Sequence, residues 1–239
     1  LELIVISDRD RWTLNRRYKN KIFILLNLPV LGVILYPMEK IKIYYADNDI
    51  AVCEKPRGVI SQESPKPNMP QLLKEQLAIE TIYTVHRLDE NTTGVMVYAL
   101  NPKAAAVLSA QIQTGGFKKQ YRAVLQGSLP EKAGRLQDLL FYDRQKSKSY
   151  IVKRERKGVK NASLNYEVTA VKGGLTYVNI DLETGRTHQI RAQFANLKAP
   201  VLGDGRYGSS EKTYIHLHCR KIEFTKPDGE KAVFESPVP

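Results

Sequence analysis

The chain has 239 residues, enough for one large domain or for a domain with an appendage. It carries 37 Lys and Arg against 25 Asp and Glu, and its net charge of +12 favours a polyanionic partner, nucleic acid before an anionic membrane. The two cysteines, Cys53 and Cys219, lie in apolar runs, so we expect reduced thiols in a cytoplasmic protein and not a disulfide.

The first 37 residues differ in composition from the rest of the chain. A basic stretch precedes the nearly all-apolar run from Ile22 to Tyr36. This run is short for a membrane-spanning helix, Pro29 would break it, and no small-residue cleavage site follows. We therefore expect a non-native or disordered extension at 1–37, a natural start at Met38, and one domain at 38–239. The alternative is a genuine short appendage.

Strand and helix patterns alternate from Ile41 onward. Residues 41–53 have the alternation of two strands around an Asp-rich turn, and Pro70 lies near the start of a helix. A second helix is expected between an Asn101 N-cap and the pair Gly115-Gly116. Strands dominate the remainder, with a strong hairpin signal at Lys172-Gly-Gly174.

Asp89 lies in a polar loop between two strand-like runs. Residues 81–85 are all β-branched or aromatic, and Asn91 to Gly94 supplies turn residues before the apolar pattern resumes. We therefore expect Asp89 at the lip of a sheet, where two packed strands can aim its carboxylate at a substrate. The alternative is that Asp89 only accepts hydrogen bonds from amides of its own loop.

The segment from Phe117 to Gly127 alternates as a strand. Tyr121 shares one face of it with Lys119 and Ala123. An aromatic ring on such a face can stack on a nucleic-acid base, a contact worth roughly 1–3 kcal/mol. Alternatively, Tyr121 is an ordinary half-buried tyrosine of a strand.

A short helix is expected to follow Thr187, its predicted N-cap. Ile190, Phe194 and Leu197 would form the buried stripe of this helix, which leaves Arg191 on another face and able to point into a cleft. Because an arginine is always charged, Arg191 would keep a neighbouring carboxylate ionised. The alternative is a surface arginine on an ordinary helix.

Residues 144–160 form a strongly basic stretch, with aromatics at Tyr142 and Tyr150. Such runs are often solvated loops. The other interpretation is contact with nucleic-acid phosphates, which would position the nucleic acid without reading its sequence. The cations assigned to this second role are Lys153, Arg154, Arg156 and Lys157.

A metal site is not expected. His216 and His218 would share one strand face while Cys219 points the other way, and no further Cys or His cluster completes four ligands. Neither a phosphate-binding P-loop nor a strand-linked Gly-x-Gly-x-x-Gly motif occurs, so we expect no nucleotide cofactor.

The segment His86-Arg-Leu-Asp89-Glu-Asn-Thr-Thr-Gly94 resembles the signature of the RluA-type pseudouridine synthases. Segments in the same order as in that family are Glu54-Lys-Pro-Arg-Gly58, Lys119-Gln-Tyr-Arg-Ala123, Gly185-Arg-Thr-His-Gln-Ile-Arg191 and Gly203-Asp-Gly-Arg-Tyr-Gly208. The resemblance extends from about Ile41 to Phe234. It implies an α+β fold with a long, bent, mixed but mainly antiparallel sheet, flanking helices and a central catalytic cleft. The Gly203 to Gly208 turn is interpreted as architecture close to the site.

The resemblance also implies the reaction, which converts uridine to pseudouridine within RNA. The N1–C1′ bond breaks, the uracil turns while bound, and C5 bonds to C1′. Asp89 would act as nucleophile or base, Tyr121 would lie against the target base, and Arg191 would pair with Asp89. Arg87 would help to displace or replace the flipped nucleotide, because a buried base must leave its stack to be reached.

The implied partner is ribosomal or transfer RNA, bound by a monomer without cofactor, metal or membrane. We expect Arg191 within about 4 Å of Asp89, Tyr121 facing the same space, and the basic stretch towards the rim. The further substrate-binding candidates are His86, which can also serve as a backbone contact, Arg186, which can also position its loop, His188 and Lys119. The rival interpretation is a non-catalytic RNA-binding or RNA-folding protein on the same fold.

Overall fold

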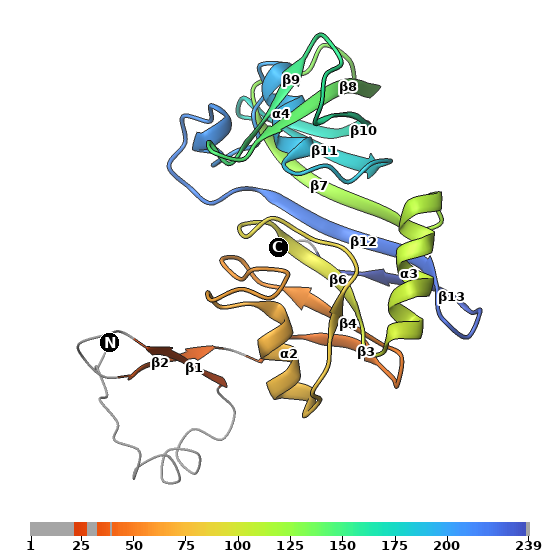
Figure 1. Ribbon diagram of the computed structural model, residues 1–239. Coiled ribbons are helices and arrows are strands. Elements are labelled where there is room, and N and C mark those ends of the chain that lie inside the picture. The colour runs from red at the N-terminus through yellow and green to blue at the C-terminus, as the bar shows by residue number, and fades with distance from the viewer. Residues whose placement is uncertain (1–21, 28–32, 39, 238–239) are drawn as a thin grey trace.

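The computed structural model describes residues 22–27, 33–38 and 40–237 (Figure 1). Strands β1 (Ile22–Asn27) and β2 (Val33–Met38) pair with each other in an antiparallel two-stranded sheet. All other described strands belong to a single sheet of 11 strands. Residues 1–21 of the predicted extension lie outside the described part, so the domain boundary at Met38 stays a prediction.

The large sheet is mixed and mainly antiparallel. In spatial order its main path is β3 (Ile43–Ala46), β4 (Ile50–Lys55), β6 (Thr93–Ala99), β12 (Leu217–Thr225), β7 (Lys118–Gln126), β11 (Leu175–Leu182), β10 (Val159–Lys172), β8 (Ala133–Asp143) and β9 (Lys148–Val152). The short strand β5 (Tyr83–Thr84) pairs with β6, and β13 (Lys231–Glu235) pairs with β12. Only the pair of β6 and β12 is parallel among the described strands.

Three α-helices flank this sheet in the described chain: α2 (Met69–Leu77), α3 (Pro102–Thr114) and α4 (Gln189–Asn196). A 3₁₀ turn, η2 (Gly205–Tyr207), follows α4. Figure 1 shows β3, β4 and β6 with α2 and α3 in one half, and β8 to β11 with α4 in the other. Strands β7 and β12 run side by side between the halves. The predicted α+β fold is therefore confirmed.

Capping residues explain where the first two helices begin. The side chains of Asn68 and Asn101 accept hydrogen bonds from the amides of Gln71 and Ala104, and a proline follows each cap in the first turn. Helix α3 ends at Gly115, whose φ of 81° suits a glycine. The predicted Asn101 cap and the Gly115 end are both confirmed.

The predicted start of α4 is wrong by one residue. His188, not Thr187, is the N-cap, and it adopts a left-handed conformation with φ of 54° and no side-chain cap. The side chain of Gln189 folds back instead, and its Oε1 accepts hydrogen bonds from the Arg186 amide and the Thr184 hydroxyl. These two bonds give the Arg186 amide and the Thr184 hydroxyl an acceptor in the loop before the helix. A side-chain cap from Thr187 is therefore not needed.

Glycine at position 94 allows the two halves to approach each other. Gly94 lies at the start of β6 opposite Cys219 of β12, with φ of +124°. A Cβ at this position would lie 2.2 Å from the carbonyl oxygen of Cys219, so any side chain would force the two strands apart. The loop that carries Asp89 ends here, and the close contact therefore fixes this loop against the centre of the sheet.

The basic stretch at 144–160 is not one loop. It comprises the turn after β8, all of β9, and the turn that leads into β10 at Val159. The predicted hairpin at Lys172-Gly-Gly174 is confirmed, since Gly173 and Gly174 both have positive φ between β10 and β11. Within the described ranges, no helix combines the length and the apolar character that crossing a bilayer requires.

Candidate active site

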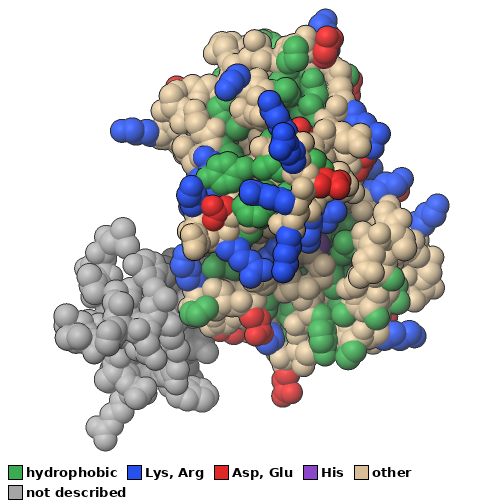
Figure 2. Space-filling view, turned by 45° about the horizontal axis from the view of Figure 1, so that its top comes forward, with side chains coloured by type: hydrophobic (Ala, Val, Ile, Leu, Met, Phe, Trp, Pro, Cys, Tyr) green, Lys and Arg blue, Asp and Glu red, His purple; other side chains and the backbone are tan. Residues whose placement is uncertain are grey.

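A cleft of about 1310 Å³ lies where the two halves meet. It is lined by the loop that carries Asp89, by β7, by the end of β11 and by the start of α4. These segments are far apart in sequence, and the β6–β12–β7 arrangement brings them together. Figure 2 shows Lys and Arg side chains gathered across the middle of one face of the molecule. Eight sequence-predicted site residues line the cleft: Asp89, Tyr121, Arg191, Arg87, His86, Arg186, His188 and Lys119.

Arg191 and Asp89 form an ion pair in the cleft. A terminal guanidinium nitrogen of Arg191 donates to Asp89 Oδ2 at 2.9 Å. The predicted approach of these two residues is thus confirmed. No loop amide in the described chain donates to the Asp89 carboxylate, so it does not serve merely as a cap of its own turn.

A second carboxylate holds Arg191 from behind. The Nε and the other terminal nitrogen of Arg191 donate to the two oxygens of Asp204, at 2.6 and 3.0 Å. This fork leaves one nitrogen of the guanidinium for Asp89. Burial lowers the pKa of Arg191 while both carboxylates raise it, and the carboxylates prevail. The arginine is therefore a fixed charge, only 6% exposed, whose direction is set by Asp204.

Buried side chains on the other side hold the Asp89 loop in place. The Lys55 ammonium donates to the carbonyls of Pro56, Val59 and Glu90 at 2.7 to 2.9 Å. Ser61 contributes a hydroxyl that bonds both the amide and the carbonyl of Leu88. Burial lowers the pKa of Lys55 to about 8. The Asp89 carboxylate is therefore carried by a loop whose backbone is hydrogen-bonded at the preceding residue, Leu88, and at the following residue, Glu90.

Tyr121 is buried in β7 and faces the cleft. It lies opposite Cys219 of β12 on one side and Ile180 of β11 on the other. Burial raises the pKa of Tyr121 well above its ordinary value, so the side chain is a neutral phenol. The expectation that Tyr121 and Asp89 face one space is confirmed, because both line the same cleft.

His188 lies beside the ion pair. Its Nε2 is 3.8 Å from Asp89 Oδ2, and its Nδ1 is 3.1 Å from the hydroxyl of Tyr207. That hydroxyl also accepts a hydrogen bond from the Ser149 amide at 2.7 Å. Burial lowers the pKa of His188, so the imidazole is uncharged at neutral pH. The β8–β9 hairpin, η2 and the start of α4 meet at this point.

Among the described residues, the side chains of the other basic candidates form no hydrogen bond or ion pair with Asp89 or Arg191. Arg87 is exposed and donates to the side chain of Gln62 at 3.2 Å, whereas Arg186 donates to the carbonyl of Asn161 in β10 at 3.0 Å. His86 has a buried ring whose Nε2 accepts from the Val97 amide, and burial lowers its pKa to about 3. This contact favours the interpretation of His86 as a backbone contact, which it makes with strand β6.

The four cations of the basic stretch that were assigned to phosphate contact are exposed in the turn between β9 and β10. The guanidinium of Arg156 lies 4.5 Å from the ring centre of Phe141. Lys153, Arg154, Arg156 and Lys157 are not among the residues that line the cleft. Their contact with RNA phosphates stays a prediction.

Sequence reasoning missed the roles of Asp204, Tyr207 and Lys55. The first two belong to the Gly203 to Gly208 turn, which was interpreted as architecture without chemistry. That turn supplies the carboxylate that orients Arg191 and the phenol that bonds His188. Spacing alone could not reveal these contacts, because their partners in α4 are brought close only by the folding of the intervening loop.

The histidines near the start of β12 have partners that explain them without a metal. His216 stacks on Tyr214 with ring centres 4.3 Å apart, and His218 lies between the hydroxyls of Thr93 and Ser236 at 2.8 and 3.0 Å. Across the described residues, no group of three or more His, Cys, Asp or Glu side chains is arranged to hold a metal ion.

Comparison with known proteins points to one family. The family model described as RNA pseudouridylate synthase matches residues 49–196. The uncharacterized RNA pseudouridine synthase YhcT of Bacillus subtilis is 30% identical over 232 residues, which cover 92% of this chain and 76% of the relative. The uncharacterized RNA pseudouridine synthase YlyB of the same organism is 31% identical over 223 residues, which cover 87% of this chain and 72% of the relative.

Solved structures share the fold. Human RNA Pseudouridylate Synthase Domain Containing 1 superposes with a TM-score of 0.71 and 23% identity over 85% of this chain and 86% of that chain. Human RNA Pseudouridylate Synthase Domain Containing 4 superposes with a TM-score of 0.69 and 23% identity, over 83% of this chain and 88% of that chain. The family model spans the Asp89 loop, β7 and α4, which are the segments that build the cleft. The chain is thus a member of the RNA pseudouridylate synthase family, and it is an RNA-modifying isomerase.

Proposed function

We propose that this enzyme isomerises specific uridines of structured ribosomal or transfer RNA in the manner of the RluA-type synthases, with Asp89 as its catalytic residue. The observation that carries the proposal is the chain of contacts from Asp204 through Arg191 to Asp89, which holds one carboxylate at the cleft. The resemblance of the Asp89 segment to the RluA-type signature supports the narrower assignment. We further propose that the enzyme works as a monomer in the cytoplasm.

The chemistry requires an ionised carboxylate. Asp89 serves either as a nucleophile at C1′ or as a base towards the ribose, and both roles need the charged form. The fixed cation of Arg191 lies 2.9 Å from Oδ2 and orients the carboxylate. Arg191 engages only Oδ2 of Asp89, and Oδ1 makes no hydrogen bond within the described residues. Oδ1 is therefore the oxygen that we assign to the reaction.

The target base has to leave its stack to reach this carboxylate. In the proposed complex the flipped uracil lies against the ring of Tyr121, a stacking contact worth roughly 1–3 kcal/mol. Arg87, exposed at the cleft, takes part in displacing the nucleotide from the RNA. His188 and Arg186 contact the nucleotides around the cleft.

The most informative test is a map of pseudouridines in ribosomal and transfer RNA from cells with and without this protein. We expect a small set of sites in structured RNA to lose pseudouridine when the protein is absent. Re-expression of the wild-type protein should restore them, and re-expression of the Asp89→Asn variant should not. Retention of every pseudouridine in the cells that lack the protein would contradict the proposal for these two RNA classes.

The basic turn between β9 and β10 can be tested through the salt dependence of RNA binding. Replacement of Lys153, Arg154, Arg156 and Lys157 by Gln is expected to weaken binding. Each lost phosphate contact should flatten the slope of log affinity against log salt by about 0.7–0.9. A matched control replaces four exposed lysines elsewhere, Lys103, Lys132, Lys172 and Lys231, which changes the net charge equally. If both variants give the same slope, the turn is a solvated loop.

A further inference from the structure

The basic side chains of the cleft differ in whether another residue of the protein accepts a hydrogen bond from them or forms an ion pair with them. The cleft is lined by Arg87, Lys118, Lys119, Arg186 and Arg191. Their protein partners are Gln62 for Arg87, Glu223 for Lys118, Asn161 for Arg186, and Asp89 with Asp204 for Arg191. Lys119 alone among these five makes no hydrogen bond or ion pair with any residue in the described ranges. Its ammonium therefore has its full hydrogen-bonding capacity available for a ligand.

The side chain of Lys119 in β7 lies beside the segment between β11 and α4. A Cβ built on Gly185 would lie 3.0 Å from the Lys119 Nζ, so the absence of a side chain at position 185 leaves room for the ammonium. The side chain is partly buried, and burial lowers the pKa of Lys119. Withdrawing a charge from water without a partner is costly, and an acceptor on a bound ligand would offset that cost.

The position of Lys119 relative to Tyr121 indicates which atom of a bound ligand would accept a hydrogen bond from the ammonium. The two residues are separated by one residue of β7 and line the same cleft, and two steps along a strand advance by about 6.6–6.8 Å. A base stacked on Tyr121 would therefore turn one of its edges towards the ammonium. An ammonium only donates hydrogen bonds, so it pairs with a carbonyl oxygen of uracil, O2 or O4, and not with the amine that cytosine carries in place of O4.

We propose that Lys119 is a further catalytic residue, whose ammonium binds a carbonyl oxygen of the target uracil and stabilises the negative charge on the detached base. This inference rests on the proposed function. When the N1–C1′ bond breaks, its electron pair leaves with N1, and the uracil anion spreads the charge over O2 and O4. C5 then bonds to C1′ and loses its proton, while N1 gains one. A fixed cation stabilises the anion more than the neutral base, and so lowers the barrier.

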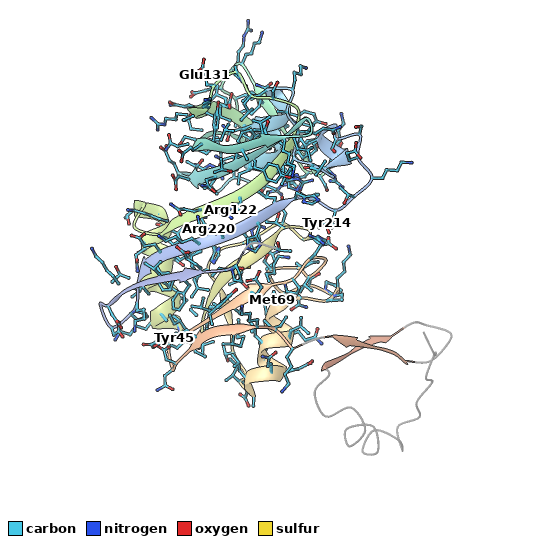
Figure 3. All side chains as sticks on the ribbon, turned by 180° about the vertical axis from the view of Figure 1, so that it is seen from behind. Tyr45, Met69, Arg122, Glu131, Tyr214 and Arg220 are labelled. Atoms are coloured by element: carbon cyan, nitrogen blue, oxygen red, sulfur yellow. The ribbon has the colours of Figure 1, made fainter. Side chains whose placement is uncertain are left out.

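The test compares three variants in single-turnover assays with saturating RNA. Lys119→Met removes the charge at similar length, and Lys119→Arg keeps it. Arg122→Met is the matched control, because Arg122 lies on the same strand but is exposed and bonds Asn179 on the opposite face (Figure 3). We expect Lys119→Met to slow pseudouridine formation by ~10²-fold or more without loss of RNA affinity. The Arg variant should retain part of the rate, and Arg122→Met should match the wild type.

Sulfur substitution identifies the oxygen. RNA with 4-thiouridine or 2-thiouridine at the target replaces one carbonyl oxygen by a weaker acceptor. At the contacted position, sulfur should slow the wild-type enzyme but not slow Lys119→Met any further, which gives a non-additive cycle. Full additivity at both positions would overturn the proposal.

Two other outcomes would also overturn it. If Lys119→Met lowers RNA affinity and the rate at saturating RNA stays at the wild-type value, Lys119 contacts a phosphate. If Lys119→Met matches the wild type in both respects, the ammonium has no part in the reaction. Neither result affects the proposed function, which is tested separately by the pseudouridine map and by the Asp89→Asn variant. Should Lys119→Met not fold, the Arg variant combined with the two thiouridine substrates makes the same comparison.

Discussion

Asp89→Asn should leave a folded protein that binds RNA but forms no measurable pseudouridine. The substitution keeps the shape of the side chain and an oxygen that can still accept from Arg191, while it removes the charge that both candidate mechanisms use. Loss of a positioned base costs about 10²–10⁴-fold in rate. Loss of a nucleophile can cost about 10⁶-fold. The size of the loss in a single-turnover assay therefore also bears on which role Asp89 has.

The control for this experiment lies on the same loop. Glu90 is the next residue, its side chain is 46% exposed, and its one ion pair in the described chain is with Lys66 at 3.8 Å. Glu90→Gln removes the same charge from the loop and should leave the rate near that of the wild type. Formation of pseudouridine by Asp89→Asn at a rate close to the wild-type rate would remove Asp89 from the mechanism.

Asp204→Asn should lower both the stability and the activity of the enzyme. Asp204 is 1% exposed and binds two nitrogens of a buried arginine. Breaking a buried ion pair by neutralising one partner costs about 3–5 kcal/mol when the remaining charge is left uncompensated. We expect a smaller loss of stability here, because Arg191 keeps its ion pair with Asp89. The amide that replaces one oxygen would also place an N–H against an N–H of Arg191. We expect an earlier midpoint of urea unfolding, and a reduced rate even where the variant is fully folded.

A carboxylate at the surface provides the comparison. Asp181 is exposed on β11 and accepts a hydrogen bond from Gln120 at 2.7 Å. Asp181→Asn should change the free energy of unfolding by no more than about 0.5 kcal/mol. If Asp204→Asn unfolds at the wild-type midpoint and retains the wild-type rate, Asp204 does not orient Arg191 in solution.

Short-range sequence patterns predicted the individual helices, turns and side chains of the site well, but they did not predict how these are arranged in space. The helix caps at Asn101 and Gly115 and the hairpin at Gly173 follow from local backbone chemistry, and the structure confirms them. The separation of Arg191 from the stripe of Ile190 and Phe194 was equally local, because it follows from helical periodicity. Such features depend on residues a few positions apart, which is why the sequence is sufficient for them. The burial of residues 189–194 on all sides of α4 was not predicted.

The parts that could not be predicted depend on tertiary contacts. Thr187 has the chemistry of an N-cap, yet the side chain of Gln189 satisfies the loop and His188 takes the cap position. The role of Asp204 depends on a turn that folds back beneath Arg191. The basic stretch looked uniform in sequence, but pairing with β8 converts its middle into β9. Gln189 is in turn held by the Ser163 carbonyl of β10, and β9 is held by the hydroxyl of Tyr207. No local pattern encodes these partners.

The place of β12 in the sheet has a consequence for the synthesis of the protein. Within the large sheet, β12 is the only strand that joins the half containing β6 to the half containing β7. Of the strands in that sheet, only β13 is translated after it. A nascent chain on the ribosome therefore carries Asp89 and Arg191 on two unconnected pieces of sheet until residues 217–225 have emerged. The cleft can be completed only after β12 has been made, so a shorter nascent chain lacks the site with which it would act on RNA.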